Sequence, residues 1–258
     1  MPRLAVYTAL TGGYDTLRQP ERVRNGVDYF CFSNDIHEER IGAWCIRPIP
    51  FEDRDPVRVS RFPKLNPHLV LPDHEASLYV DANVLVTEEL DAATDRALAA
   101  GTPCAMVPHP DRKGTFEEGL FVLRHSMGEP FRVYRQMRNL IRSGFRDDAG
   151  LFVCSVVFRR HLDPRVVAFS EAWWRGFQAG AKRDQLSVMP ALAEAELGPG
   201  VLVSPDYVRR NTARHAAKNA HSVLWHAWRF AARKVLEAKL TRSLVRRGIN
   251  CPAGHTEV

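Results

Sequence analysis

Short apolar runs recur along the chain and alternate with segments in which apolar residues lie three or four positions apart. The apolar runs predict buried strands at residues 4–10, 28–33, 44–49, 76–86, 102–107, 151–158 and 201–203. The segments with apolar residues three or four positions apart predict helices at residues 58–71, 88–100, 115–125, 130–143, 163–177 and 185–196. Pro67 is expected to kink the first of these helices. Strands that follow helices in turn along the chain are typical of an α/β fold. Within each predicted strand nearly all positions are apolar, instead of apolar and polar in alternation, which predicts a sheet covered on both faces.

Polar clusters follow three of the predicted strands. They read TGGYD at residues 11–15, DAN at residues 81–83 and HPDR at residues 109–112. Ligands of open α/β sheets bind at the carboxyl ends of the strands. We therefore expect a binding site where these three clusters meet.

Asp81 and Asn83 interrupt the apolar segment YVDANV. A carboxylate is costly to bury unless it is paired, hydrogen-bonded or bound to a metal. Carboxylate and amide oxygens suit Mg²⁺ or Mn²⁺, whose remaining positions can be taken by phosphates and water. A tight turn is the alternative, because Asp and Asn are common turn residues.

Cationic residues share one face of the predicted helix at residues 58–71, namely Arg58, Arg61, Lys64 and His68. Such a face could hold a diphosphate, to which arginine can bind through two hydrogen bonds, or it could be solvated. Gly12 and Gly13 permit a ligand to approach the backbone closely, although a simple turn explains them equally well.

Two later segments add polar candidates. HPDRKGTFEE contributes His109, Arg112 and Glu118, and KRDQLS contributes Arg183, Asp184 and Gln185. Asp184 could cap the following helix or face a ligand. The motifs GxSxG and HExxH are absent, which leaves serine-hydrolase and zinc-protease chemistry without support.

Composition narrows the class of protein. The 258 residues are 45% hydrophobic and 26% charged, which is typical of a globular chain. Five cysteines occur without a CxxC pair, so neither a disulfide framework nor a zinc site is expected. The first apolar run is short and no uncharged apolar stretch could span a bilayer, so we expect a cytoplasmic protein, or one peripheral at the inner face of the membrane.

Positive charge is concentrated at the C-terminal end. Residues 207–250 hold eleven lysines and arginines against one acid, Glu237, so they carry +10 while the whole chain carries +6. We expect a catalytic domain at residues 1–205 and a basic helical tail at residues 206–258. The tail could contact an anionic membrane surface or pack on the domain; no nucleic-acid partner is expected, since no recognised module accompanies the charge.

Taken in order, the motifs resemble a glycosyltransferase-like family that includes the plant TOD and mucilage-related MUCI proteins and many bacterial members. The resemblance runs from residue 6 to residue 187 and rests on the strings VYTALTGGYD, DYFCFS, R-x-x-R-x-x-K-x-x-PH, SLYVDANV, HPDR with following glutamates, and RDQLS. More distantly, the chain resembles family 8 glycosyltransferases.

The resemblance implies a GT-A fold, with a Rossmann-type mixed sheet flanked by helices. It implies transfer of a sugar, with retention, from a nucleotide-sugar donor such as a UDP-sugar to a hydroxyl of a glycan or glycolipid. It also implies that Asp81 and Asn83 bind Mn²⁺ or Mg²⁺, with His215 or His221 as candidates for a third ligand.

The same resemblance implies roles for the other candidate residues. Asp184 and Gln185 would face the transferred sugar as catalytic residues. Donor binding falls to Tyr7, Thr8, Gly12, Gly13, Tyr14, Asp15, Arg58, Arg61, Lys64 and Asp81. Acceptor or sugar binding falls to His109, Arg112, Glu118 and Arg183. Since Asn83 stands where family 8 enzymes carry an acid, the alternative is an inactive nucleotide-sugar or glycan-binding module on the same scaffold.

Overall fold

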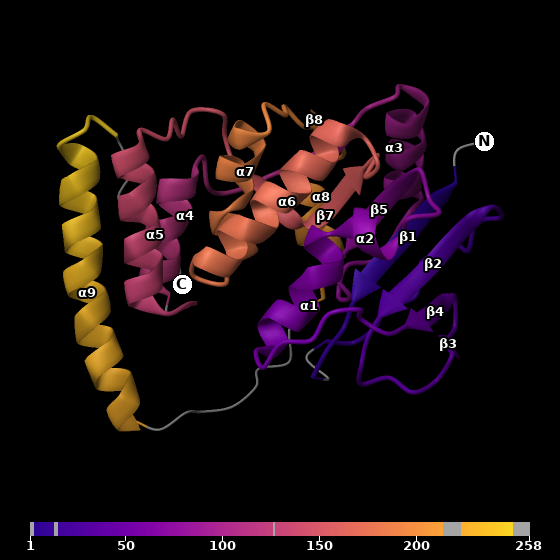
Figure 1. The fold of residues 1–258 in the computed structure, drawn as a ribbon, viewed down its shortest axis with the longest axis horizontal. Coiled ribbons are helices and arrows are strands. Elements are labelled where there is room, and N and C mark those ends of the chain that lie inside the picture. The colour runs from indigo at the N-terminus through magenta and orange to yellow at the C-terminus, as the bar shows by residue number, and fades with distance from the viewer. Residues whose placement is uncertain (1–2, 13–14, 126, 214–222, 250–258) are drawn as a thin grey trace.

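A mixed eight-stranded sheet with the order β3-β4-β2-β1-β5-β7-β6-β8 forms the centre of the computed structural model, which describes residues 3–12, 15–125, 127–213 and 223–249 (Figure 1). Its strands are β1 (Leu4–Ala9), β2 (Val27–Phe32), β3 (Arg40–Ile41), β4 (Trp44–Arg47), β5 (Ala76–Val80), β6 (Cys104–Pro108), β7 (Phe152–Arg159) and β8 (Gly200–Val201). Strands β4, β2, β1 and β5 run parallel, and β7 runs antiparallel between β5 and β6. The carboxyl ends of β1, β2, β5 and β6 therefore lie at one edge, beside the amino end of β7.

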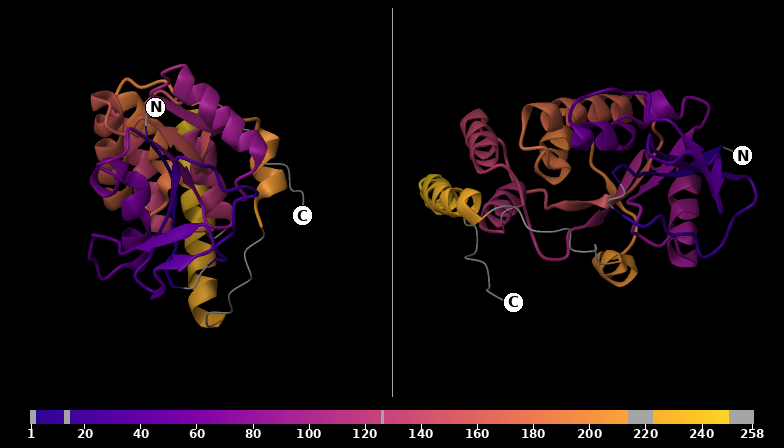
Figure 2. Two further views of the ribbon diagram at one scale, coloured as in Figure 1. Left: turned by 90° about the vertical axis from the view of Figure 1, so that its right-hand side faces the viewer. Right: turned by 90° about the horizontal axis from the view of Figure 1, so that it is seen from below.

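Helices cover both faces of this sheet (Figure 2, right). One face packs against α1 (Pro56–Leu65), α2 (Pro67–Val70), α6 (Pro164–Ala179) and α7 (Val188–Glu194). The other face packs against α3 (Glu88–Ala99) and α8 (Pro205–Asn211). The apolar residues of β1 alternate between these two cores, with Tyr7 in the first and Val6 in the second. The predicted α/β class, a mixed sheet flanked by helices, is confirmed.

A separate helical group stands beside the carboxyl edge of the sheet, at the left in Figure 1. It consists of α4 (Thr115–Arg124), α5 (Pro130–Ser143) and α9 (Val223–Val245). Its core includes Phe116, Met137 and, from the short 3₁₀ helix η1 (Asp184–Leu186), Leu186. Helix α5 ends at Gly144, whose φ of 75° is a left-handed conformation that glycine adopts without strain.

The structure corrects three predicted elements. The helix expected at residues 58–71 ends at Leu65 and resumes at Pro67, which confirms the interruption expected at Pro67: a proline disfavours the helical backbone at the residue before it, here Asn66. The strand expected at residues 76–86 ends at Val80, and beyond it Val84 makes only an isolated bridge to Thr212. The helix expected at residues 185–196 is divided into η1 and α7.

The C-terminal segment packs on the rest of the chain. Tyr207 of α8 is buried, and its hydroxyl donates to the Leu85 carbonyl over 2.6 Å. In the part of α9 whose side chains are described, residues 232–245, Leu236, Leu240 and Leu244 are buried, and the last two join the core of α4 and α5. The boundary at residue 205 and the membrane contact stay predictions: the three leucines of this part of α9 are covered by the rest of the chain, whereas Val235 and Val245 are exposed.

Within the described residues, no helix combines the length and the apolarity needed to cross a bilayer.

Candidate functional site

Two of the predicted polar clusters meet at the carboxyl edge of the sheet. Asp81 directly follows β5, and its backbone amide donates to the Ser155 carbonyl over 2.8 Å, which ties the turn to β7. His109 directly follows β6, and its amide donates to the Leu151 carbonyl over 2.7 Å. The antiparallel strand β7 thus holds both clusters in place.

A buried lysine lies at the centre of the first group of charges, which we call the lysine cluster (Lys64, Arg61, Asp81, Asp184 and Tyr79). Lys64 extends from the last turn of α1, and its Nζ lies 2.5 Å from Asp184 Oδ2 and 3.4 Å from Asp81 Oδ1. Arg61 Nε lies 3.6 Å from the same Asp184 oxygen. The Tyr79 hydroxyl donates to Asp81 Oδ1 over 2.8 Å. Two cations and two carboxylates therefore converge from α1, β5 and η1.

The lysine cluster keeps Asp184 ionised. Burial alone would raise the pKa of Asp184, but Lys64 and then Arg61 outweigh burial and hold that pKa well below its usual range. Burial would likewise lower the pKa of Lys64, yet Asp184 and Asp81 raise it. Each ion thus stabilises its partner in a site that excludes most water.

Solvent reaches the members of the lysine cluster unequally. Lys64 has 2% of its side chain exposed and Asp184 has 13%, whereas Arg61 and Asp81 each have about one-third exposed. A ligand that approaches the edge of the sheet would therefore contact Arg61 and Asp81 first. Lys64 lies behind them and is placed to fix the two carboxylates.

A buried glutamate lies at the centre of the second group, which we call the glutamate cluster (Glu118, Arg112, Arg183 and His109). Glu118 extends from α4 and is completely buried. Arg112 Nε donates to Glu118 Oε2, and Arg183 lies 3.6 Å from Glu118 Oε1. Arg112 also lies 2.7 Å from His109 Nε2 and stacks 4.0 Å over the Phe121 ring. The structure therefore brings together the four residues expected to bind an acceptor or sugar.

Burial dominates the electrostatics of the glutamate cluster. It raises the pKa of Glu118 even though Arg112 and Arg183 oppose it. Burial, followed by Arg112, lowers the pKa of His109 to about 4, so the imidazole is neutral at pH 7. The two clusters adjoin through Arg183 and Asp184, which are consecutive. They also influence one thiol, since burial first, and then Asp184, Asp81 and Glu118, raise the pKa of Cys154.

The remaining donor-binding candidates lie in different surroundings. Tyr7 and Thr8 are completely buried, and the Tyr7 hydroxyl accepts from Arg159 over 2.7 Å within the core. Gly12, in the loop after β1, has a φ of 67°, and its amide donates to Asp35. Arg58 points away from the lysine cluster, toward Asp53 at 3.2 Å and the Gln178 carbonyl.

The other predicted site residues lie outside the lysine and glutamate clusters or outside the described residues. Asp15 is partly buried in the same loop as Gly12. Gln185 donates through Nε2 to the Phe152 carbonyl, which places it at the start of β7. Gly13, Tyr14, His215 and His221 lie outside the described residues.

Asp81 and Asn83 differ in how a cation could reach them. The carboxylate of Asp81 is one-third exposed, whereas Asn83 is 5% exposed and its amide nitrogen donates to the Ala213 carbonyl over 3.2 Å. Among the residues that the structure describes, no three His, Cys, Asp or Glu side chains gather to hold a metal. Mg²⁺ characteristically binds through one or two carboxylates together with phosphates and water. Of the two predicted ligands only Asp81 is open to solvent, and its Oδ1 already faces Lys64 Nζ and the Tyr79 hydroxyl.

Sequence reasoning missed several residues that shape the site. Tyr79 holds Asp81, and the Trp173 indole donates to the Asp184 carbonyl over 2.9 Å. Arg159 is buried at the end of β7 and donates to the Lys64 carbonyl over 2.6 Å, which anchors the end of α1. An arginine that ends the apolar run LFVCSVVFR was the available signal, because a buried cation must find acceptors.

The chain shows only weak similarity to known proteins, at the level of structure. No family model matches the chain, and no curated protein matches it. Among solved structures, mouse xyloside xylosyltransferase 1 in its apo form is similar with a TM-score of 0.34 and 11% identity, over 80% of each chain. This similarity is too weak to assign a role, so the fold and the site are described from this chain's own residues.

Proposed function

We propose that this protein is a glycosyltransferase that moves a sugar from a nucleotide-sugar donor, most simply a UDP-sugar, to a hydroxyl of a glycan or glycolipid. The observation that carries the proposal is the lysine cluster, in which Arg61, Lys64, Asp81 and Asp184 converge at the carboxyl edge of the sheet. This edge is where α/β sheets bind ligands. The ordered motifs that resemble a glycosyltransferase-like family include these same four residues.

The cluster supplies the electrostatics that the reaction needs. When the bond between the anomeric carbon and the diphosphate breaks, its electron pair leaves with the nucleoside diphosphate. Cations already in place stabilise that developing charge. Arg61 is accessible enough to contact the diphosphate, while Lys64 acts as a positioning residue that orients Asp184 and Asp81.

Asp184 and Gln185 are assigned to the transferred sugar. The lowered pKa of Asp184 keeps its carboxylate ionised at neutral pH, so it can stabilise positive charge that develops at the anomeric carbon. By the resemblance the reaction retains the anomeric configuration. The acceptor hydroxyl forms the new bond to that carbon as the bond to the diphosphate breaks, and its proton passes to the departing diphosphate.

Asp81 is assigned to a divalent cation, Mn²⁺ or Mg²⁺, with Asn83, two positions further along the turn, as the second predicted ligand. Such a cation would act as a Lewis acid on the diphosphate when bound. The chain's own part is to present the accessible carboxylate of Asp81, which the Tyr79 hydroxyl holds in place.

The glutamate cluster is assigned to hydroxyl groups of the acceptor or of the donor sugar. His109, Arg112, Glu118 and Arg183 combine hydrogen-bond donors with acceptors beside Asp184. This composition suits a sugar, whose hydroxyl groups both donate and accept.

A thermal-shift panel tests the proposal. The full-length protein is heated with UDP-, GDP-, CMP- and dTDP-sugars, with and without Mn²⁺, and then assayed for donor hydrolysis in the absence of acceptor. We expect one nucleotide class to raise Tm and to be hydrolysed slowly, and hydrolysis to fall at least about 100-fold in Asp184→Asn. The surface variant Glu194→Gln is the control.

Each other outcome has a defined meaning. Binding without hydrolysis at any metal concentration would identify an inactive nucleotide-sugar-binding module. A panel in which no nucleotide sugar raises Tm would overturn the proposed function.

A further inference from the structure

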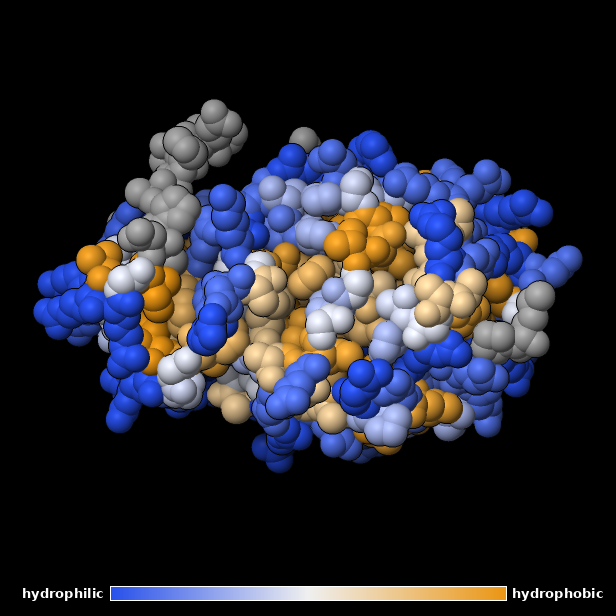
Figure 3. Space-filling model, turned by 90° about the horizontal axis from the view of Figure 1, so that it is seen from above, coloured by the Kyte–Doolittle hydropathy of each residue, from blue (hydrophilic) through white to orange (hydrophobic). Residues whose placement is uncertain are grey.

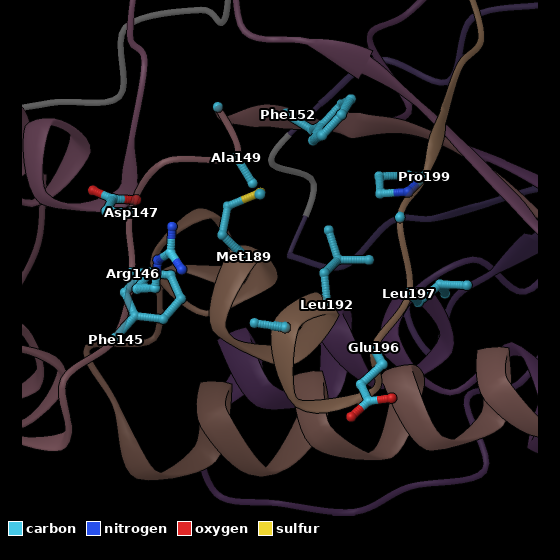
Figure 4. Close-up of a pocket in the computed structure, with 13 residues that line it drawn as sticks. Phe145, Arg146, Asp147, Ala149, Phe152, Met189, Leu192, Glu196, Leu197 and Pro199 are labelled. Atoms are coloured by element: carbon cyan, nitrogen blue, oxygen red, sulfur yellow. The ribbon is translucent and has the colours of Figure 1, made fainter.

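An apolar pocket of about 330 Å³ opens next to the site, between the connection from α5 to β7, helix α7 and the connection from α7 to β8 (Figure 4). Its apolar walls are formed by Phe145, Phe152, Met189, Leu192, Leu197 and Pro199. Apolar side chains also gather in the middle of the molecular face that carries these two connections (Figure 3). A volume above about 300 Å³ lies in the range of small-molecule sites.

The polar side chains around the pocket are directed elsewhere. Arg146 lies 2.6 Å from Asp148. Asp147 accepts from the amides of Thr115 and Phe116, both over 2.8 Å, and so caps α4. Figure 4 shows the carboxylates of Asp147 and Glu196 at the periphery, turned away from Met189 and Leu192. The walls therefore favour an apolar ligand over a sugar or a phosphate, whose polar groups would lose water without finding partners.

The pocket shares a wall with the proposed catalytic segment. Phe152 lines the pocket, and its carbonyl accepts from the side chain of Gln185. Met189 and Leu192 extend from α7, which begins directly after η1, the helix that contains Asp184 and Gln185. The pocket thus adjoins the segment that carries Asp184 and Gln185.

We propose that this pocket binds an apolar group of the acceptor, an alkyl chain or aromatic ring attached to the sugar that is glycosylated. The role as an acceptor subsite rests on the proposed function, whereas the binding of an apolar group does not. A cavity of about 150 Å³ lined by similar side chains holds one benzene ring. The pocket therefore has room for about two rings or an alkyl chain of similar volume.

The test compares octyl β-glucoside with methyl β-glucoside, which differ only in the alkyl group. Binding to the full-length protein is measured without a donor, by ligand-detected NMR below the micellar concentration. Ala193 is exposed and lines the pocket, so Ala193→Trp fills the pocket from its rim without disturbing the core. Ala92→Trp is the matched control, since Ala92 is an exposed helical alanine in α3, on the opposite face of the sheet.

We expect octyl β-glucoside to bind at least tenfold more tightly than methyl β-glucoside. Ala193→Trp should remove that preference and Ala92→Trp should preserve it. Ala193→Arg, which places a charge at the same rim, should act as Ala193→Trp does and serves if the larger residue impairs folding. Equal binding of the two glucosides by the wild type, or a preference that both Ala193 variants keep, would overturn the proposal.

Two further outcomes separate the proposals from each other. If the octyl preference depends on Ala193 but no nucleotide sugar binds, the pocket stands as a site for apolar ligands and the proposed function fails. If nucleotide sugars bind and the alkyl group makes no difference, the proposed function stands and the pocket assignment fails. A dimer in light scattering that Ala193→Trp dissociates would assign the pocket to a second copy of the chain and would also overturn the proposal.

Discussion

The lysine cluster and the glutamate cluster both bury a charge at their centre, but the charges are of opposite sign. In the first, the buried cation Lys64 lies between Asp81 and Asp184. In the second, the buried anion Glu118 lies between Arg112 and Arg183. Each central ion has two partners of opposite sign, yet the carboxylates respond differently. The cations hold the pKa of Asp184 well below its usual range, whereas burial keeps the pKa of Glu118 above its usual value.

This difference indicates which cluster depends more on its charges. A lowered pKa means that the folded protein favours the ionised carboxylate, so neutralising Asp184 should weaken the fold. A raised pKa means that the folded protein favours the protonated form, so neutralising Glu118 should cost less. The ion pairs of the lysine cluster thus contribute to stability, while those of the glutamate cluster only partly offset the cost of burial.

The largest effect should follow removal of the central cation. Lys64→Met leaves Asp184 buried with only Arg61 and Arg183 nearby, and breaking a buried pair from one side typically costs about 3–5 kcal/mol. We expect a decrease of that size in the free energy of unfolding, measured by urea denaturation followed by tryptophan fluorescence. Adding Asp184→Asn to Lys64→Met should restore part of the loss, because it removes the uncompensated charge.

A surface pair provides the control for Lys64→Met. Arg175 and Glu194 pair with about 60% of each side chain exposed, so Arg175→Met should change the free energy of unfolding by about 1 kcal/mol or less. If Lys64→Met is as mild as Arg175→Met, Lys64 does not hold the lysine cluster together.

The second effect compares the two carboxylates directly. Asp184→Asn should lower the free energy of unfolding by about 1.5–3 kcal/mol, as expected for loss of hydrogen bonds to a charged group. Glu118→Gln should cost less than that, because the raised pKa of Glu118 means that the folded protein already favours the neutral side chain. Both variants are compared at pH 7 by urea denaturation. Equal costs would contradict the contrast between the clusters.

Sequence reasoning identified the edge of the sheet but not how the charges pair. The apolar runs predicted the sheet, and the position of polar clusters after them predicted the site, because the direction of parallel strands determines both. The pairing depends on long-range contacts: Lys64 meets Asp184 because α6, which shares a core with α1, holds the Asp184 carbonyl through Trp173. The hydroxyl of the buried Tyr7 likewise has its partner 152 positions away, at Arg159.

Local spacing also failed where the backbone departs from regular structure. The shared helical face of Arg58, Arg61 and Lys64 left a diphosphate site and a solvated face open. In the structure Arg61 and Lys64 lie in the lysine cluster, whereas Arg58 pairs with Asp53. The apolar pattern of YVDANV predicts a strand on both sides of Asp81, whereas the strand ends at Val80. The tight turn given as the alternative for Asp81 and Asn83 is confirmed, because the amide of Val84 donates to the Asp81 carbonyl over 2.9 Å.

The third effect concerns Asp81, the accessible carboxylate of the lysine cluster. Asp81→Ala should reduce the Mn²⁺-dependent part of UDP affinity about tenfold or more, a change of about 1.4 kcal/mol. Isothermal titration of UDP with and without Mn²⁺, on wild type and variant, measures this. Lys182→Ala, outside both clusters, is the control. Unchanged metal-dependent binding in Asp81→Ala would exclude Asp81 as the metal ligand.

The smallest effect concerns pH and the neutral member of the glutamate cluster. The pKa of His109 is lowered to about 4, while an unfolded histidine titrates near its ordinary value of about 6.5. Between these values the unfolded chain binds more protons than the folded one, so His109 makes the free energy of unfolding rise with pH from about 4 to about 6.5. Its partial exposure limits this rise to about 1 kcal/mol.

His109→Gln should remove only the part of the pH dependence of the free energy of unfolding that is due to His109. The difference in the free energy of unfolding between wild type and His109→Gln, measured by urea denaturation from pH 4 to pH 7, should therefore increase with pH and level off above about 6.5. Glu118 has the opposite slope, because its raised pKa favours the folded state at low pH, but it is present in both proteins and cancels in the difference. A difference that is flat across this range would mean that His109 is not held neutral, and the glutamate cluster would then carry one more positive charge below pH 6.5.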